Sequence, residues 1–160
     1  MIVRIRVGFS TSAAWHARVV RWLTRSEVSH AFFILENSFL GDDLVLEADP
    51  PDVHLRALSE FVKTNRIVKT VEMPETLRAG ISQAVRLLGR PYDYRAFFGV
   101  GLVVLGRWLR RKWRNPFNAR KSLDCIEMIV SVLQLSGYPG SERLDARQLS
   151  PQQLMEFLSP

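Results

Sequence analysis

The chain begins with alternating nonpolar and basic side chains. Positions 3, 5, 7 and 9 are nonpolar, and Arg4 and Arg6 lie between them. A period of two is typical of a strand with one buried face, so we predict a strand over residues 2–9. Residues 29–36 are almost all nonpolar, as in a central strand covered on both faces. These two patterns predict that the first half of the chain contributes strands to a sheet.

Turn residues divide the rest of the chain into further elements. Residues 44–48 read as a strand that ends at Asp49-Pro50-Pro51 and pairs with strand 29–36 as an antiparallel hairpin. Short strands are predicted near 53–56 and 66–72. Helical periodicity predicts helices over 74–88, 94–113 and 123–135, and a last helix capped by Ser150. The expected fold class is α+β, an antiparallel sheet packed against helices.

Size and composition limit the class of protein. The chain has 160 residues, of which 47% are hydrophobic, and this fits a single domain over 1–160 with its own core. A single cysteine excludes a disulfide framework and cysteine-based zinc sites. His16, His30 and His54 are too far apart for a histidine-pair metal motif. We therefore expect neither a metal nor another cofactor.

The nonpolar stretches bear on localisation. The amino terminus alternates and lacks the unbroken nonpolar run of a signal peptide. The longest such run, AFFGVGLVVL at residues 96–105, is too short to cross a bilayer. We expect a soluble protein that is cytoplasmic, or exported without a signal peptide by phage machinery or a secretion system. Peripheral contact with a membrane remains open.

Basic residues are concentrated in one segment of a chain whose formal net charge is +6. Residues 107–121 hold seven basic residues and no acidic one, with Trp108 and Trp113 among them. Such a segment can be a solvated helix face, or it can contact lipid headgroups, a cell-wall polymer or nucleic acid. The residues predicted to contact an anionic surface are Arg107, Arg110, Arg111, Lys112 and Arg114.

Cys125 opens the predicted helix 123–135. The unpaired N–H groups and the dipole at a helix N-terminus favour a thiolate, so Cys125 is a candidate nucleophile. A lone cysteine can equally be a small buried hydrophobic residue. Asp124 next to the thiol would oppose the thiolate if its carboxylate were close, or it could cap the helix.

Two polar residues stand in otherwise nonpolar strands. His30 lies early in strand 29–36 and Glu47 lies in strand 44–48. Each must find a partner to be buried without a large cost, and each alone can be structural. The predicted hairpin brings the carboxylate beside the imidazole. With Cys125 they form the cysteine, histidine and acid set of an activated thiol, with Glu47 orienting His30.

The motifs and their order resemble a known family. The segments are VSHAFFIL, LVLEADPPDVHLR, LLGRPYDYRAFFG, LDCIEMIVSVL and LSPQQL. They resemble the circularly permuted branch of the NlpC-type papain-like hydrolases, the YiiX-like group, which is related to the lecithin retinol acyltransferase-like proteins. In that branch the histidine and its polar partner precede the cysteine, as they do here. Ile126 departs from the pattern, which has a small polar residue after the cysteine.

The resemblance implies a permuted papain-like fold with the nucleophile at a helix N-terminus. It implies a cysteine peptidase or amidase acting on a cell-wall peptide, with Tyr92 facing the substrate or oxyanion. Two alternatives remain: a lipid acyltransferase or thioesterase at a membrane surface, and a non-catalytic module that binds anionic lipid or nucleic acid. The expected partner is a peptide or acyl substrate, with an anionic membrane or cell wall as a second one. Nucleic acid is the least expected partner, and oligomeric state is not predicted.

Overall fold

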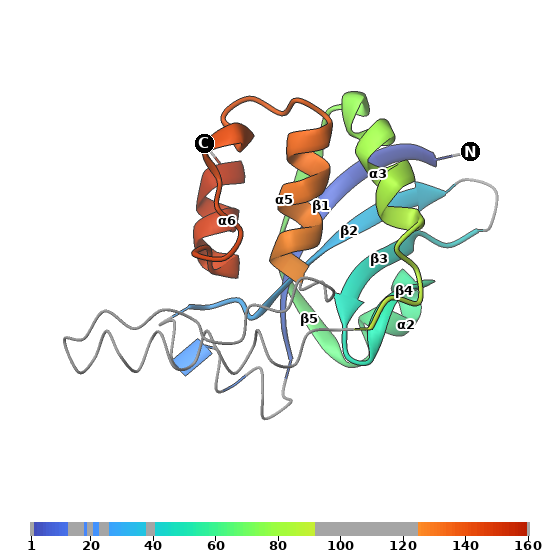
Figure 1. The fold of residues 1–160 in the computed structure, drawn as a ribbon. Coiled ribbons are helices and arrows are strands. Elements are labelled where there is room, and N and C mark those ends of the chain that lie inside the picture. Colours follow the sequence, from blue (N-terminus) through green and yellow to red (C-terminus); the bar gives the residue numbers. More distant parts are fainter. Residues whose placement is uncertain are drawn as a thin grey trace.

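The computed structural model describes residues 2–12, 18, 21–22, 26–37, 41–91 and 125–159. Within them, five strands form one antiparallel sheet in the order β4-β3-β2-β1-β5. The strands are β1 (Ile2–Ser12), β2 (His30–Asn37), β3 (Leu44–Asp49), β4 (Asp52–Ala57) and β5 (Asn65–Met73). Figure 1 shows the sheet crossed on one face by helices. The prediction of an antiparallel sheet combined with helices is confirmed at this level.

Helices supply the second layer. The helical elements are α2 (Leu58–Phe61), η1 (Glu75–Leu77), α3 (Arg78–Val85), α5 (Cys125–Leu135), η2 (Ser141–Arg143) and α6 (Pro151–Leu158). In Figure 1, α3 and α5 lie across the sheet and α6 stands beside α5. The predicted cap of the last helix is confirmed, because Ser150 and Gln153 form a reciprocal capping box at α6.

Each face of the sheet has its own nonpolar core. The larger core joins the helix side of the sheet to α3, α5 and α6, and includes Phe9, Phe33 and Ile129. The smaller core lies on the other face and consists of Phe32, Ile34, Val45 and Phe61. Strand β2 contributes to both cores, as the nonpolar run in its sequence predicts. Successive β2 side chains alternate between the two cores.

The close approach of α3 to α5 depends on a glycine. A Cβ atom at Gly80 would lie 2.6 Å from the carbonyl oxygen of Val132, nearer than any side chain tolerates. With only hydrogen at this position, the backbones of the two helices meet directly. This contact fixes α5, and therefore its first residue, relative to the sheet.

Several element boundaries differ from the predictions. Strand β1 continues three residues past the expected end, because Ser10, Thr11 and Ser12 pair with β5. The helix predicted over 74–88 is a short 3-10 turn followed by α3, and the chain leaves it before Gly89 at a positive φ of 77°. The predicted helix 94–113 lies outside the described residues, as do positions 123 and 124 of the cysteine helix. Among described residues, no helix is long and nonpolar enough to span a membrane.

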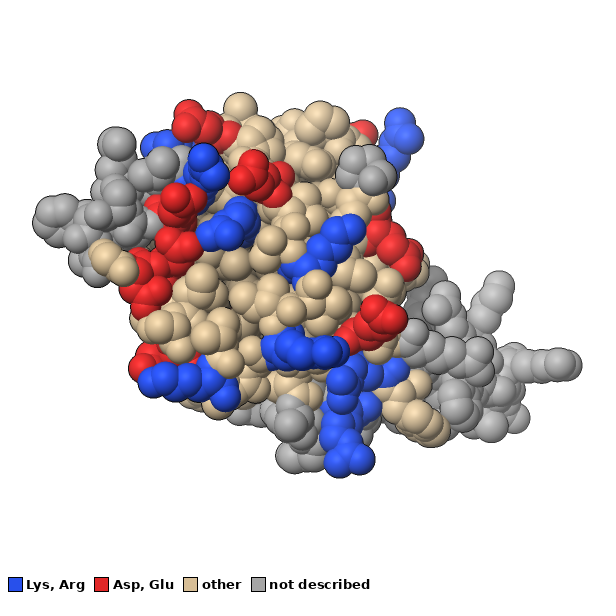
Figure 2. Space-filling model, turned by 180° about the vertical axis from the view of Figure 1, so that it is seen from behind, with Lys and Arg blue, Asp and Glu red and all other residues tan. Residues whose placement is uncertain are grey.

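Opposite charges are distributed together over one face of the molecule. Figure 2 shows acidic and basic side chains interspersed on the face seen from behind. Arg4 lies 3.8 Å from Glu36 and 3.6 Å from Glu72, while Arg6 lies 2.6 Å from Asp43. Exposed pairs of this kind contribute little to stability, but they cancel charge locally.

Candidate active site

His30 is the first residue of β2, where the strand reaches the end of the sheet. It lies opposite Ser10 of β1, and its ring stacks on Phe32 with 5.8 Å between ring centroids. Only 13% of its side chain is exposed. Its Nε2 lies 2.8 Å from Oε2 of Glu47, which is hydrogen-bond distance. Stacking and this bond together fix the orientation of the ring.

Glu47 is a completely buried carboxylate in the middle of β3. Register places Phe33 opposite Leu46, so Glu47 and His30 project from the same face as diagonal neighbours. Its second oxygen, Oε1, lies 2.5 Å from Nε of Arg56 and 3.2 Å from Nε2 of His54. Neither contact has hydrogen-bond angles, and Oε1 has no hydrogen-bond partner among the described residues. The attraction at Oε1 is therefore Coulombic, whereas Oε2 is hydrogen-bonded.

Both groups that flank Oε1 of Glu47 lie on strand β4. His54 lies directly opposite Glu47 in the β3–β4 ladder, and Arg56 follows two residues later on the same face. The Arg56 guanidinium also lies over the ring of Phe61, 4.7 Å from its centroid. Nδ1 of His54 lies 3.0 Å from the carbonyl oxygen of Asp52.

Cys125 is the first residue of α5 and packs into the larger core. It is 8% exposed, and it is the only cysteine of the chain. Its thiol is close enough to His30 to raise the pKa of the imidazole through a hydrogen bond and an electrostatic interaction. The His30 ring therefore interacts with both Glu47 and Cys125.

The surroundings change the pKa of both His30 and Glu47. Burial disfavours the imidazolium, but the hydrogen bonds and charges of Cys125 and Glu47 outweigh it, and the pKa of His30 is raised well above 6.5. Burial alone would raise the pKa of Glu47. His30 and then Arg56 reverse that effect, so the pKa of Glu47 lies below its ordinary value of 4.5. The buried carboxylate and the ring are thus held in their charged forms.

Sequence reasoning did not assign His54 and Arg56 to the site. The signal was present in the turn: Asp49 pairs with Asp52 across Pro50-Pro51, and this short connection fixes Glu47 opposite His54. Alternation along β4 then puts Arg56 on the same face. A histidine and an arginine at i and i+2, opposite a buried acid in a hairpin, indicate such a network.

The other predicted site residues lie outside the described part of the chain. These are Tyr92 and the basic residues Arg107, Arg110, Arg111, Lys112 and Arg114. Within the described ranges, no group of three or more histidine, cysteine, aspartate or glutamate side chains could hold a metal ion. The set of His30, Glu47, Cys125, His54 and Arg56 is the site considered below.

Comparison with known proteins adds no relative. No protein-family model and no curated protein sequence matches the chain.

Proposed function

We propose that the protein is a cysteine hydrolase of permuted papain-like, NlpC-type fold that cleaves an amide bond through Cys125, His30 and Glu47. The observation that supports the proposal is that the His30 ring interacts with both the Cys125 thiol and the buried Glu47 carboxylate. A cysteine nucleophile needs a base within hydrogen-bond reach and a third group that orients the base. The order of these residues along the chain supports the permuted arrangement.

In the acylation step, the Cys125 thiolate attacks the carbonyl carbon of the substrate while His30 is the imidazolium. The N–H of Cys125 at the start of α5 is one of the donors that a helix leaves unpaired, and it stabilises the resulting oxyanion. Collapse of the tetrahedral intermediate breaks the C–N bond. His30 gives its proton to the leaving amine, which leaves a thioester on Cys125 and a neutral imidazole.

In the deacylation step, the neutral His30 removes a proton from water, and the hydroxide attacks the thioester carbonyl. The C–S bond breaks, the carboxylic acid leaves, and the thiolate and imidazolium are restored. Glu47 keeps Nε2 of His30 occupied throughout, since its Oε2 lies 2.8 Å away. This leaves Nδ1 as the nitrogen that faces the sulfur and the substrate.

The proposed substrate is an amide in a cell-wall peptide, and this assignment follows from the resemblance to the NlpC-type hydrolases. The catalytic set itself requires only a carbonyl with an exchangeable leaving group. An amide, an ester and a thioester all meet that requirement. The substrate panel in the test therefore includes all three bonds.

The test is covalent labelling followed by turnover. Cys125 is the only thiol in the chain, so intact-mass spectrometry reports its alkylation by iodoacetamide without interference. We expect wild-type protein to react at about pH 6 and His30→Ala to react at least about 10-fold more slowly. Peptide-amide, phospholipid-ester and acyl-thioester substrates are then assayed, with the peptide amide expected to be cleaved.

Matched variants identify the cause of any change. Cys125→Ala removes the nucleophile and should abolish turnover, whereas Arg86→Gln changes an exposed arginine outside the site and should leave both assays unchanged. If Cys125→Ala retains full turnover, or if His30→Ala is alkylated as fast as wild type, the proposal is wrong. Cleavage of the lipid ester alone would contradict the peptide assignment.

A further inference from the structure

A groove of about 570 Å³ lies at the end of the sheet that carries His30. Two arginines and a tryptophan approach it from helical positions in the segment that joins β1 to β2. The loop before β2 and the strand β5 supply the other walls. This arginine groove is lined by Arg18, Arg21, Trp22, Ser26, Glu27, Arg66 and Val68.

The charges around the arginine groove do not cancel. Its described lining residues include three arginines and a single carboxylate, Glu27. No ion pair within 4.0 Å is formed by Arg18, Arg21 or Arg66 with any described residue. Three like charges facing one hollow repel one another, and that repulsion is relieved when an anion enters. Arginine also supplies a planar set of donors that matches phosphate and carboxylate oxygens.

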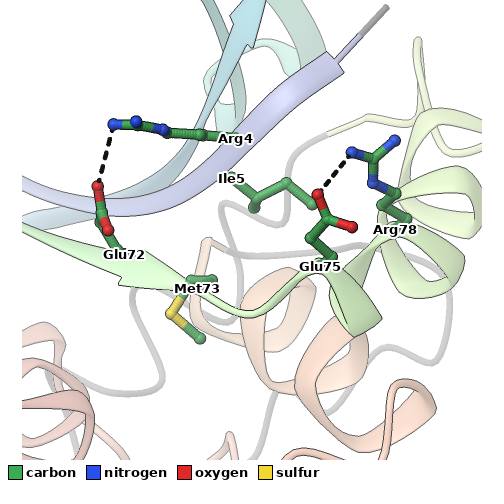
Figure 3. Close-up of a pocket in the computed structure, with 6 residues that line it drawn as sticks. All are labelled: Arg4, Ile5, Glu72, Met73, Glu75 and Arg78. Atoms are coloured by element: carbon green, nitrogen blue, oxygen red, sulfur yellow. Dashed lines mark hydrogen bonds and ion pairs between the residues drawn. The ribbon is translucent and has the colours of Figure 1, made fainter.

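A second hollow shows the contrasting arrangement. It has a volume of about 130 Å³ and lies where Ile5 of β1 meets Met73 of β5, toward the other end of β1 from His30. Figure 3 shows its arginines paired with its glutamates: Arg4 with Glu72 and Arg78 with Glu75. Its charges balance within the protein. Surplus positive charge is therefore a property of the arginine groove and not of every hollow on the described surface.

The arginine groove is tied closely to the catalytic strand. Arg66 lies opposite Thr11, and the neighbouring Ser10 lies opposite His30. Two strand spacings of about 5 Å each put the backbone of Arg66 about 10 Å from that of His30. The Arg66 side chain projects from the sheet face opposite to that of His30, because Thr11 and Ser10 alternate. Ser26 holds the intervening loop, since its hydroxyl donates to the carbonyl of Val28 over 2.6 Å and accepts from the N–H of Val28 over 3.1 Å.

We propose that the arginine groove binds an anionic group, phosphate or carboxylate, carried by the acyl substrate of Cys125. The proposal rests on the proposed function and adds a requirement for negative charge near the scissile bond. Arg18, Arg21 and Arg66 bind the oxygens of the anion. The exposed side chains of Trp22 and Val68, which are 64% and 37% exposed, cover the nonpolar part of the substrate beside it.

Binding is measured on Cys125→Ala, so that no probe is consumed. The probes are inorganic phosphate, short-chain dihexanoyl phosphatidate and N-acetyl-alanyl-glutamate, each with a neutral analogue where one exists. Calorimetry should detect binding of at least one anion and not of its neutral analogue. The added substitutions Arg18→Gln, Arg21→Gln and Arg66→Gln should each weaken that binding roughly 10-fold. Tighter binding of phosphatidate or of the dipeptide than of phosphate identifies the source of the anion.

The control is Arg86→Gln with Arg147→Gln, which removes two exposed arginines that have no ion pair among the described residues. If this control weakens binding as much as the groove variants do, the effect is one of net charge and the proposal is wrong. The same holds if none of the three probes binds. In wild-type background, the groove variants should keep the iodoacetamide rate of Cys125. If an anion binds but the thiol is unreactive, the result would contradict the proposed function and would still support anion binding in the arginine groove.

Discussion

Nε2 of His30 and Oε2 of Glu47 lie 2.8 Å apart, and the Glu47 side chain has no exposed surface. A carboxylate removed from water is costly unless cations and donors compensate it. Here the compensation comes from both neighbouring strands, His30 on β2 and His54 with Arg56 on β4. The expected properties of the site follow from this single buried charge and the groups around it.

The pKa of His30 depends on its two partners, so it should fall when either is removed. Cys125→Ala and Glu47→Gln each delete a hydrogen bond and a negative charge that raise it. NMR titration of the His30 ring protons should give a pKa well above 6.5 in wild type and a lower value in each variant. An unchanged His30 pKa in Cys125→Ala would show that thiol and ring do not interact.

The contributions of His30 and Glu47 to stability should have opposite pH dependence. The raised pKa of His30 means that its contribution is complete below 6.5 and is lost as the pH rises through the folded-state pKa. The lowered pKa of Glu47 means that its contribution is complete above 4.5 and is lost as the pH falls through the folded-state pKa. Urea unfolding across pH measures the difference in free energy of unfolding between wild type and each variant. For His30→Gln this difference should become smaller as the pH rises, and for Glu47→Gln it should become smaller as the pH falls. The reverse trend for either variant would contradict the assignment.

Arg56 should stabilise the folded protein as well as compensate the buried charge of Glu47. Arg56→Gln removes the cation at Oε1 of Glu47 and the guanidinium above Phe61. The expected loss in the free energy of unfolding is about 1–3 kcal/mol, with Arg56→Lys intermediate because it keeps the charge. Urea denaturation measures this loss, and Arg86→Gln is the surface control. A loss for Arg56→Gln no greater than for the control would mean that Glu47 does not need this cation.

His54 is expected to act through Glu47 as a positioning residue. His54→Gln can place an amide N–H dipole near the position of Nε2, which lies 3.2 Å from Oε1, and so keeps part of the electrostatic attraction, whereas His54→Asn is too short to reach it. The alkylation rate of Cys125 should fall roughly 10-fold in His54→Asn and recover in His54→Gln. The His30 titration should shift in the first variant and return in the second. Equal effects of both substitutions would indicate packing alone.

Gly8 affects the packing beneath the His30 ring. A Cβ atom at Gly8 would lie 2.5 Å from the ring of Phe32, and Phe32 stacks on His30. Gly8→Ala should destabilise the protein by about 1–3 kcal/mol, since the ring must move within a closed core. Combining it with Phe32→Leu should give a smaller loss than the sum of the two single variants. Additive losses in urea denaturation would show that the two positions do not share this space.

Local patterns predict the sheet and the paired strands of the site well. Alternation in β1, the nonpolar run in β2 and the Pro50-Pro51 turn indicate the strands and the hairpin, and Glu47 and His30 lie on adjacent strands. These features follow from neighbours in sequence, where steric and hydrogen-bonding rules are strong.

Features that depend on contacts between distant parts of the chain are harder to predict from the sequence. The extension of β1 to Ser12 depends on pairing with β5, which begins at Asn65. The four-residue helix α2 exists because Phe61 packs against Phe32 in the second core, and nothing in its own sequence demands it. The arginine groove combines residues from the segments 18–27 and 66–68, so no single stretch of sequence indicates it. Tertiary packing overrides local preference in each case.

The residues of the site come from two parts of the chain that are far apart in sequence. His30, Glu47, His54 and Arg56 belong to β2, β3 and β4, which are consecutive in sequence and adjacent in the sheet, whereas Cys125 arrives on α5. Contacts between sequence neighbours form early in folding, and contacts that close long loops form later. On the proposed function, the thiol therefore has the reactivity of an ordinary exposed cysteine in the nascent chain and is activated by His30 only when α5 docks. At about pH 6, where an ordinary thiol is almost entirely protonated, a rise in alkylation rate during refolding would then report the docking of α5.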